Sequence, residues 1–89
     1  MLSPITTTQF KKDIKKIKKQ NKDMHELKAI MTKLIDEIPL DTKHKDHKLT
    51  GNYLYRRECH IQPNWLLIYK LLPTEIIFER TGSHSELFK

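Results

Sequence analysis

Residues 57–82 read RECHIQPNWLLIYKLLPTEIIFERTG, and this stretch decides the fold. The first run, residues 55–61, begins two residues before this stretch, and its side chains alternate in character, which is typical of a strand. Residues 65–71 are apolar on both sides, as in a central strand that is covered on both faces. Turn-forming residues separate the runs, and Gly82 ends the third run, residues 75–81. The sequence therefore predicts three consecutive antiparallel strands with residues 65–71 in the middle.

Two amphipathic helices are predicted upstream of these strands. Threonines at positions 6–8 offer N-caps for the first helix. Its apolar positions recur at i, i+4 and i+7: Phe10, Ile14 and Ile17. Asp23 and Glu26 resemble a capping box for the second helix, whose apolar face covers residues 24–38. Pro39 ends this helix, and the short connection predicts an antiparallel αα-hairpin.

The remaining segments are short. Residues 2–6 favour a strand, which Pro4 restricts to an edge of the sheet. Residues 41–50 are predicted to be a polar loop, and residues 83–89 a tail. The order β-α-α-β-β-β predicts an α+β fold of one domain over residues 1–89, a small antiparallel sheet with the αα-hairpin packed on one face. The other face of the sheet is expected to be open.

Length and composition exclude several classes of protein. A chain of 89 residues is too short for a multi-domain enzyme with its own cofactor fold. No apolar run approaches the roughly 18 residues of a membrane span, and the N-terminus lacks the basic and then apolar order of a signal peptide. The single cysteine, Cys59, excludes an intrachain disulfide framework and indicates a reducing compartment. We therefore expect a cytoplasmic protein without membrane contact.

The net charge of +6, from 17 basic and 11 acidic residues, is concentrated in one segment. Residues 11–22 hold seven lysines and one acid, Asp13, which accounts for the whole excess. Such a run attracts polyanions, and added salt weakens the attraction. Because no aromatic residues are interleaved with the lysines, the pattern is more typical of a solvated helix face than of a recognition surface.

Three histidines occur where loops and strand ends can converge on the open face: His47, His60 and His84. Imidazole titrates near neutrality, so two or three such groups beside one phosphate can both accept and donate a proton. RNA cleavage uses this chemistry, because a base removes the 2′-hydroxyl proton, the oxygen attacks the adjacent phosphorus in line, and an acid protonates the departing 5′-oxygen. Arg57 or Arg80 is a candidate for stabilising the charge on the phosphoryl oxygens. Each histidine taken alone is more often a structural or surface residue.

Alternation within the last predicted strand places Arg80 on the side of Ile76 and Phe78, which are apolar and favour the core. Parity within one strand does not fix how that strand lies against His60 on another. The residues alone therefore leave open whether the histidines and the arginine meet.

Other candidate groups give weaker signals. His44 and His47 form an H-x-x-H pattern, but structural zinc sites favour paired ligands at both ends, so no metal or other cofactor is expected. Trp65 lies in an apolar run that favours the core. Phe88, next to the C-terminus, either stacks on an unpaired base or anchors the tail against the core.

Five segments then follow one another along the chain: Leu49-Thr50-Gly51, Arg57-Glu58-Cys59-His60, Pro63-Asn64-Trp65, Leu67-Ile68-Tyr69-Lys70 and Glu79-Arg80-Thr81-Gly82-Ser83-His84. Together with the Leu87-Phe88 end, they closely resemble the YafQ-like branch of the RelE/ParE toxin superfamily. The similarity covers essentially the whole chain and is densest over residues 46–88.

The resemblance implies a RelE-like, microbial ribonuclease-like fold and a bacterial type II toxin. Such a toxin is an mRNA interferase that cuts mRNA, typically in the ribosomal A site, and is held inactive by a cognate antitoxin. Matching positions imply a catalytic set for proton transfer and phosphate stabilisation: His47, His60, Arg80 and His84. The expected substrate-binding residues are Asn64, Trp65 and Phe88, with Arg57 as a further candidate.

Asn64 stands where the resembled family usually has an aspartate. An asparagine side chain forms hydrogen bonds but cannot act as a carboxylate base. We expect the activity to be retained and driven by the histidines.

Two other functions remain open. The same fold carries non-catalytic inhibitors, such as gyrase-poisoning relatives, which need no histidine set. A plain RNA-binding module would use the lysines for affinity and cleave nothing. For the toxin, the expected partners are mRNA, the ribosome and an acidic antitoxin segment that docks on the lysine-rich helix or on the open face.

Overall fold

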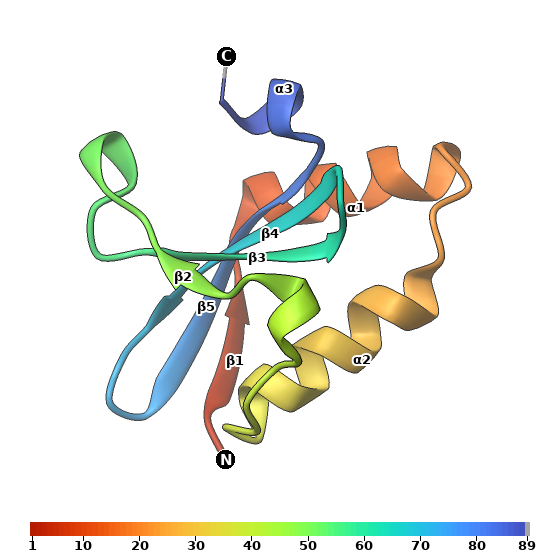
Figure 1. Ribbon diagram of the computed structural model, residues 1–89. Coiled ribbons are helices and arrows are strands. Elements are labelled where there is room, and N and C mark those ends of the chain that lie inside the picture. The colour runs from red at the N-terminus through yellow and green to blue at the C-terminus, as the bar shows by residue number, and fades with distance from the viewer. Residues whose placement is uncertain (89) are drawn as a thin grey trace.

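The computed structural model describes residues 1–88, with the exception of the Asn52 side chain, and Figure 1 shows the predicted α+β arrangement of a sheet with two longer helices on one side. The elements in chain order are β1 (Ser3–Thr6), α1 (Thr8–Lys19), α2 (Met24–Ile35), η1 (Thr42–His44), β2 (His47–Lys48), η2 (Gly51–Tyr53), β3 (Arg57–Gln62), β4 (Trp65–Leu71), β5 (Glu75–Gly82) and α3 (His84–Leu87). The two η elements are short 3-10 turns. Among the helices of residues 1–88, none combines the length and the apolar character needed to cross a bilayer.

Both longer helices begin where the sequence predicts. The Thr7 side chain caps α1 by accepting a backbone N–H at 2.9 Å, and Asp23 caps α2 in the same way at 2.9 Å. The second helix ends before Ile38, earlier than predicted, because Glu37 adopts a left-handed φ of 58° and the Ile38 N–H donates back to the Lys33 carbonyl at 2.8 Å. Ile38 thus leaves the apolar face of the helix and is 49% exposed.

The sheet has the strand order β1-β5-β4-β3-β2, and all neighbouring strands are antiparallel except β1 and β5, which are parallel. The prediction of a purely antiparallel sheet is therefore wrong for β1. Strands joined by tight turns must run antiparallel, but both helices and most of the chain separate β1 from β5, so no turn fixes its direction. Pro4 lies in this edge strand, opposite Ile76.

Two segments that were predicted to be irregular form short elements. His47 and Lys48 pair with β3 as the strand β2. The tail forms α3 because Ser83 and Glu86 make a capping box: the Ser83 hydroxyl accepts the Glu86 N–H at 3.3 Å, and the Glu86 carboxylate accepts the Ser83 N–H at 2.8 Å. In Figure 1, α3 lies beyond the end of β5, away from α2.

Strand β4 is buried on both faces, and each residue from Trp65 to Tyr69 is at most 1% exposed. Helices α1 and α2 pack on its odd-numbered side chains. Leu66 and Ile68 point the other way and are covered by Leu87 of α3 and by Tyr53 of η2. The face expected to be open is therefore partly covered.

Trp65 provides a test of this core, because its indole Nε1 donates to Thr81 Oγ1 at 3.0 Å within it. Trp65→Phe removes the hydrogen bond and leaves unfilled space, so we expect the free energy of unfolding to fall by about 2 kcal/mol. Urea denaturation measures this change. Tyr55→Phe alters an aromatic side chain that is 79% exposed and should leave the midpoint unchanged. Equal midpoints for Trp65→Phe and the parent chain would contradict the assignment of Trp65 to the core.

Candidate active site

Cross-strand pairing brings three of the predicted catalytic residues to one face of the sheet. His47 lies opposite Glu58, Glu58 opposite Ile68, and Ile68 opposite Arg80. His60 follows Glu58 on the same side of β3. Directly paired residues point to the same side of a sheet, and Ile68 belongs to the side away from α1 and α2. His47, His60 and Arg80 therefore leave the sheet on the side of Ile68, and the Arg80 side chain ends at Asp13 of α1.

Arg80 reaches this face through a β-bulge in β5. Tyr69 pairs with Phe78 while Ile68 pairs with Arg80, so Glu79 is an extra residue in the ladder. The extra residue reverses the alternation of side chains and directs Arg80 to the face opposite that of Phe78. The placement of Arg80 with the apolar residues of its strand, predicted from parity, is therefore wrong.

A buried carboxylate lies between two of the histidines. Glu58 is 5% exposed; its Oε1 lies 3.2 Å from Nε2 of His60, and its Oε2 lies 3.8 Å from Nε2 of His47. The two imidazole rings are 6.5 Å apart. Nδ1 of His47 donates to the Lys45 carbonyl at 2.5 Å, which fixes the orientation of this ring. The carboxylate is thus within hydrogen-bond distance of His60 and faces His47 at a longer distance.

His84 approaches the same region from the other side of β4. His60 lies opposite Leu66, and Leu66 lies opposite Gly82, two residues before His84. Neighbouring strands are about 4.8 Å apart, so the backbones at His60 and Gly82 are about 10 Å apart. A group that contacts both imidazoles would lie between these two backbones, above Leu66. We call the surface formed by His47, Glu58, His60, Arg80 and His84 the histidine face.

Helix α3 is docked by contacts that orient His84 and Phe88. Asn64, in the turn between β3 and β4, accepts the His84 backbone N–H through Oδ1 at 3.2 Å. The rings of His84 and Phe88 are 4.8 Å apart, and Phe88 packs edge-on against Tyr53 at 5.3 Å. The Tyr53 hydroxyl donates to the Leu87 carbonyl at 3.1 Å. Of the two alternatives for Phe88, this packing supports the tail anchor.

Asp13 of α1 holds Arg80 in place. The guanidinium donates to the Asp13 carboxylate through Nε at 2.8 Å and through Nη2 at 3.3 Å. The same carboxylate accepts the Thr81 backbone N–H and the Gln9 side-chain amide, each at 3.1 Å. The hydrogen bonds that Arg80 donates to Asp13 are the largest cause of the raised pKa of Arg80. The arginine is therefore both charged and fixed in direction.

A second ion pair joins α1 to α3. The Lys16 ammonium group contacts the Glu86 carboxylate, which also accepts the Ser83 backbone N–H. The hydrogen bond from Lys16 is the largest of the causes that lower the pKa of Glu86 to about 2. Because Glu86 and His84 share one short helix, α1 helps to set the position of His84.

Two of the predicted substrate-binding residues lie outside the histidine face. Trp65 is fully buried beneath the helices. Arg57 lies opposite Tyr69 on the helix-covered side, where its Nε donates to Asp46 and to the Tyr69 hydroxyl, each at 3.3 Å. The Trp65 side chain is therefore inaccessible to a substrate in this structure, which corrects that prediction, and Arg57 lies on the other face of the sheet from the histidines. Burial also raises the pKa of the Cys59 thiol to about 12, as suits a core residue.

Two residues of the site were missed by the sequence analysis. Glu58 precedes His60 by two positions on a strand, and this spacing by itself places both on one face. Asp13 is the single acid among the seven lysines of residues 11–22, and this isolated position is the sequence feature that could have indicated a specific role for it. Within the described part of the chain, no group of three or more His, Cys, Asp or Glu side chains is arranged to hold a metal ion.

Comparison with known proteins finds relatives along the whole chain. Residues 2–89 match the family described as "Bacterial toxin of type II toxin-antitoxin system, YafQ". The mRNA interferase toxin YafQ of Escherichia coli K12 is 47% identical over 81 residues, 90% of this chain and 88% of that protein. The crystal structure of YafQ from E. coli BL21(DE3) matches with a TM-score of 0.95 at 41% identity, over 100% of both chains. A chain in the crystal structure of the E. coli DinJ–YafQ complex matches with a TM-score of 0.93 at 42% identity, again over 100% of both chains.

The Lys16–Glu86 pair makes stability depend on pH in a defined direction. A carboxylate whose pKa is lowered on folding stabilises the protein fully above its ordinary value of 4.5, and this contribution is lost as the pH falls toward about 2. The parent chain should therefore melt at a higher temperature than Glu86→Gln at pH 7, and the difference should vanish between pH 4.5 and about 2. Lys16→Gln should reduce the pH-dependent part, whereas Lys18→Gln, an exposed neighbour outside the pair, should keep it. A difference between parent and Glu86→Gln that does not change with pH would contradict the pairing.

Proposed function

The chain belongs to the YafQ family of bacterial type II toxins, and we propose that the histidine face is the catalytic site at which it cleaves mRNA. As a member of this family, it is the toxin of a type II toxin–antitoxin system and an mRNA interferase, an endoribonuclease. The resemblance inferred from the sequence is confirmed, and so is the fold class. The observation that carries the proposal for the site is the Glu58 carboxylate between His47 and His60, in one row with Arg80.

Proton transfer is assigned to His60 and His84. A scissile phosphodiester bound between them has one imidazole to remove the 2′-hydroxyl proton and another to protonate the 5′-oxygen as the P–O bond breaks. Glu58 faces Nε2 of His60, so Nδ1 of the neutral ring is left to exchange the proton with RNA. His47 faces the other oxygen of Glu58 at 3.8 Å and completes the pair of rings beside this carboxylate.

Arg80 is assigned to the phosphoryl oxygens. Negative charge develops on these oxygens as the 2′-oxygen attacks, and a fixed guanidinium stabilises it without having to reorient. Asp13 supplies this fixation through two hydrogen bonds. Phe88 and Asn64 support the reaction indirectly, because they hold the helix that carries His84.

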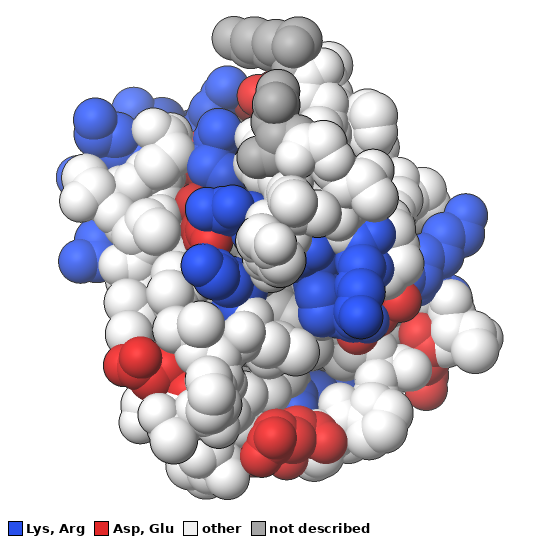
Figure 2. All heavy atoms as spheres, turned by 90° about the vertical axis from the view of Figure 1, so that its left-hand side faces the viewer, with Lys and Arg blue, Asp and Glu red and all other residues white. Residues whose placement is uncertain are grey.

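The charge of the surface suits an RNA substrate. Figure 2 views the side of the sheet away from α2 and shows lysine and arginine side chains across its middle and upper part, with acidic side chains gathered mainly lower down. The chain as a whole carries a net charge of +6, which attracts the phosphate backbone over a range that salt shortens. The ribosome is proposed as the place of cleavage, because it would hold the message in the in-line geometry that the reaction needs. The cytoplasm, where messages meet ribosomes, is the proposed location of this activity.

A cognate antitoxin is the proposed protein partner. E. coli YafQ has been crystallised in complex with DinJ. In this chain the exposed lysines of α1 and the histidine face are the surfaces proposed for an acidic antitoxin segment. An antitoxin segment that binds at the Lys16–Glu86 pair would also contact α3, the helix that carries His84.

Substitution of the catalytic histidines tests the mechanism. His60→Ala and His84→Ala should each lower the cleavage rate roughly 10²–10⁴-fold, since each removes a general acid or base. The products of the parent chain should carry a 2′,3′-cyclic phosphate or 3′-phosphate and a 5′-hydroxyl, because the attacking oxygen belongs to the RNA. His25→Ala, an exposed histidine at the start of α2, is the matched control. Normal cleavage by both variants would exclude the mechanism, and growth arrest with intact messages would point to a non-catalytic inhibitor or an RNA-binding module.

Asn64 provides a second test. Its Oδ1 accepts the His84 N–H, and an aspartate at the same position would accept it equally well. Because Glu58 already supplies a carboxylate to the histidines, Asn64→Asp should change the cleavage rate by less than about tenfold. Asn64→Ala, which removes the acceptor, should lower the rate more than Asn64→Asp does. A silent parent chain beside an active Asn64→Asp variant would show that position 64 must carry a charge.

A further inference from the structure

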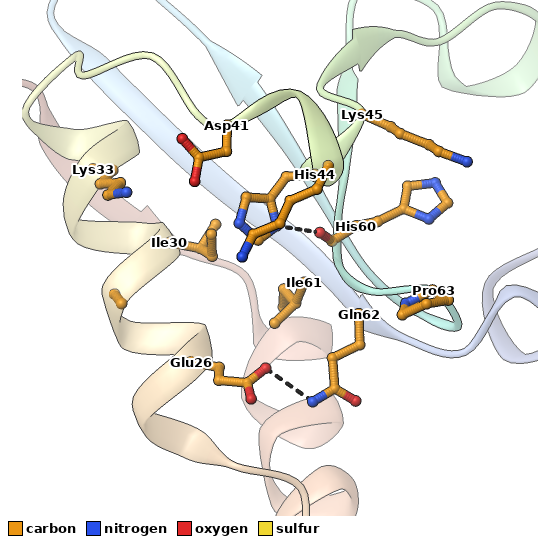
Figure 3. Close-up of a pocket in the computed structure, with 12 residues that line it drawn as sticks. Glu26, Ile30, Lys33, Asp41, His44, Lys45, His60, Ile61, Gln62 and Pro63 are labelled. Atoms are coloured by element: carbon orange, nitrogen blue, oxygen red, sulfur yellow. Dashed lines mark hydrogen bonds between the residues drawn. The ribbon is translucent and has the colours of Figure 1, made fainter.

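A cleft of about 710 Å³ lies between α2, η1 and the end of β3. Figure 3 shows α2 along one wall, the η1 segment along another, and Ile30 and Ile61 between them. The Gln62 side-chain amide donates to Glu26 Oε2 at 2.9 Å and joins β3 to α2 across one end. The cleft is within the size range of small-ligand sites, about 300–1,000 Å³.

The cleft shares a wall with the histidine face. Nδ1 of His44 is 2.7 Å from the His60 carbonyl oxygen and donates to it, which fixes η1 to the strand that carries His60. Figure 3 shows the His60 ring on the side of β3 away from α2, while its backbone borders the cleft. Lys45 lines the cleft, and its carbonyl is the acceptor that orients His47. Residues 42–47 therefore connect the cleft directly to two histidines of the proposed site.

The chemistry of the lining combines positive charge with an apolar floor. Its basic residues are Lys33, Lys43 and Lys45, of which Lys45 directs its side chain away from α2 to the side of the His60 ring (Figure 3). None of these three takes part in the ion pairs found among residues 1–88. Of the two acids in the lining, Glu26 is engaged by Gln62, and Asp41 is the other. Ile30 and Ile61 form the floor and are each 5% exposed.

We propose that this cleft binds a nucleotide of the message next to the scissile phosphodiester. Ammonium groups above an apolar floor suit a nucleotide, because its phosphate is anionic and its base presents apolar faces. The inference rests on the proposed function, since a message must continue past the cleaved bond in both directions. On the α3 side, Tyr53, Leu87 and Phe88 fill the surface. On the other side, the cleft begins behind the β3 backbone at His60, whose ring points away from α2, so the message must pass around the end of β3 to enter it.

An acidic antitoxin segment is another class of occupant that satisfies the charge of the cleft. Contiguity with His47 and His60 favours RNA, because a nucleotide in the cleft is covalently linked to the one that reacts between the histidines. An inhibitor segment needs no such continuity. The antitoxin is therefore kept as an outcome of the test.

The kinetic test removes the lysines from the cleft. We expect Lys33→Gln/Lys43→Gln to raise KM about tenfold for a ribosome-bound message of mapped cleavage position, with kcat within about twofold of the parent value and a weaker dependence of KM on salt. Lys28→Gln removes an exposed lysine of the same helix outside the cleft and is the matched control. Its KM should equal that of the parent chain.

Crosslinking identifies the occupant directly. A message with a 2′-deoxynucleotide at the cleavage position cannot be cut, and a 4-thiouridine beside that position should crosslink on irradiation to residues 26–33 or 41–45. The inference is overturned if Lys33→Gln/Lys43→Gln keeps the KM of the parent chain and the crosslinks form elsewhere. This conclusion requires that His60→Ala and His84→Ala are inactive, so that the proposed function itself holds. Normal cleavage by those two histidine variants shows instead that the proposed function has failed. Unchanged KM with weakened antitoxin binding, measured by calorimetry, assigns the cleft to the antitoxin and excludes the RNA proposal.

Discussion

Burial of β4 on both faces is the constraint on which the site depends. A strand with no exposed side chain from Trp65 to Tyr69 needs a cover on each side of the sheet. Helices α1 and α2 provide one cover. The second cover cannot be another large layer in so short a chain, and it consists of α3 and η2 above Leu66 and Ile68. Because α3 starts with His84, completing the core also carries a catalytic candidate to the region of His60.

The parts of the fold that sequence patterns predict are those fixed by local alternation and capping. The double-sided apolar run predicts the central strand, because only a strand covered on both faces buries consecutive residues. Alternation predicts the wrong face for Arg80, because the extra residue Glu79 at the bulge shifts the two-residue period of side-chain directions. It also gives no direction for β1, which tertiary packing alone sets. The Ser83-x-x-Glu86 spacing that starts α3 is present in the sequence, but a helix of four residues is too short for its propensity to stand out.

The sequence predicts the candidate site less completely than it predicts the fold. The chemistry of imidazole indicates the histidines as candidates, and the family resemblance implies that they act together. Neither gives the distances between their side chains. Alternation along β3 places Glu58 and His60 on one side of the strand. It places Arg57 on the other side, together with the buried Cys59. Asp13 could not be paired with Arg80 by any local rule, because the hydrogen bonds join residues 67 positions apart. A buried carboxylate nonetheless requires several donors, and this one has four.

The asparagine at position 64 separates two tasks that one carboxylate can perform. The first is geometric, to accept the N–H at the start of α3, and an amide oxygen performs it at 3.2 Å. The second is electrostatic, to stabilise a protonated imidazole, and an amide performs it poorly because it has no net charge. In this chain Glu58 is the carboxylate beside the imidazoles, with oxygens 3.2 Å from Nε2 of His60 and 3.8 Å from Nε2 of His47. Loss of the carboxylate from the turn is therefore compatible with a working histidine face, since the charge is supplied by the strand beneath the rings.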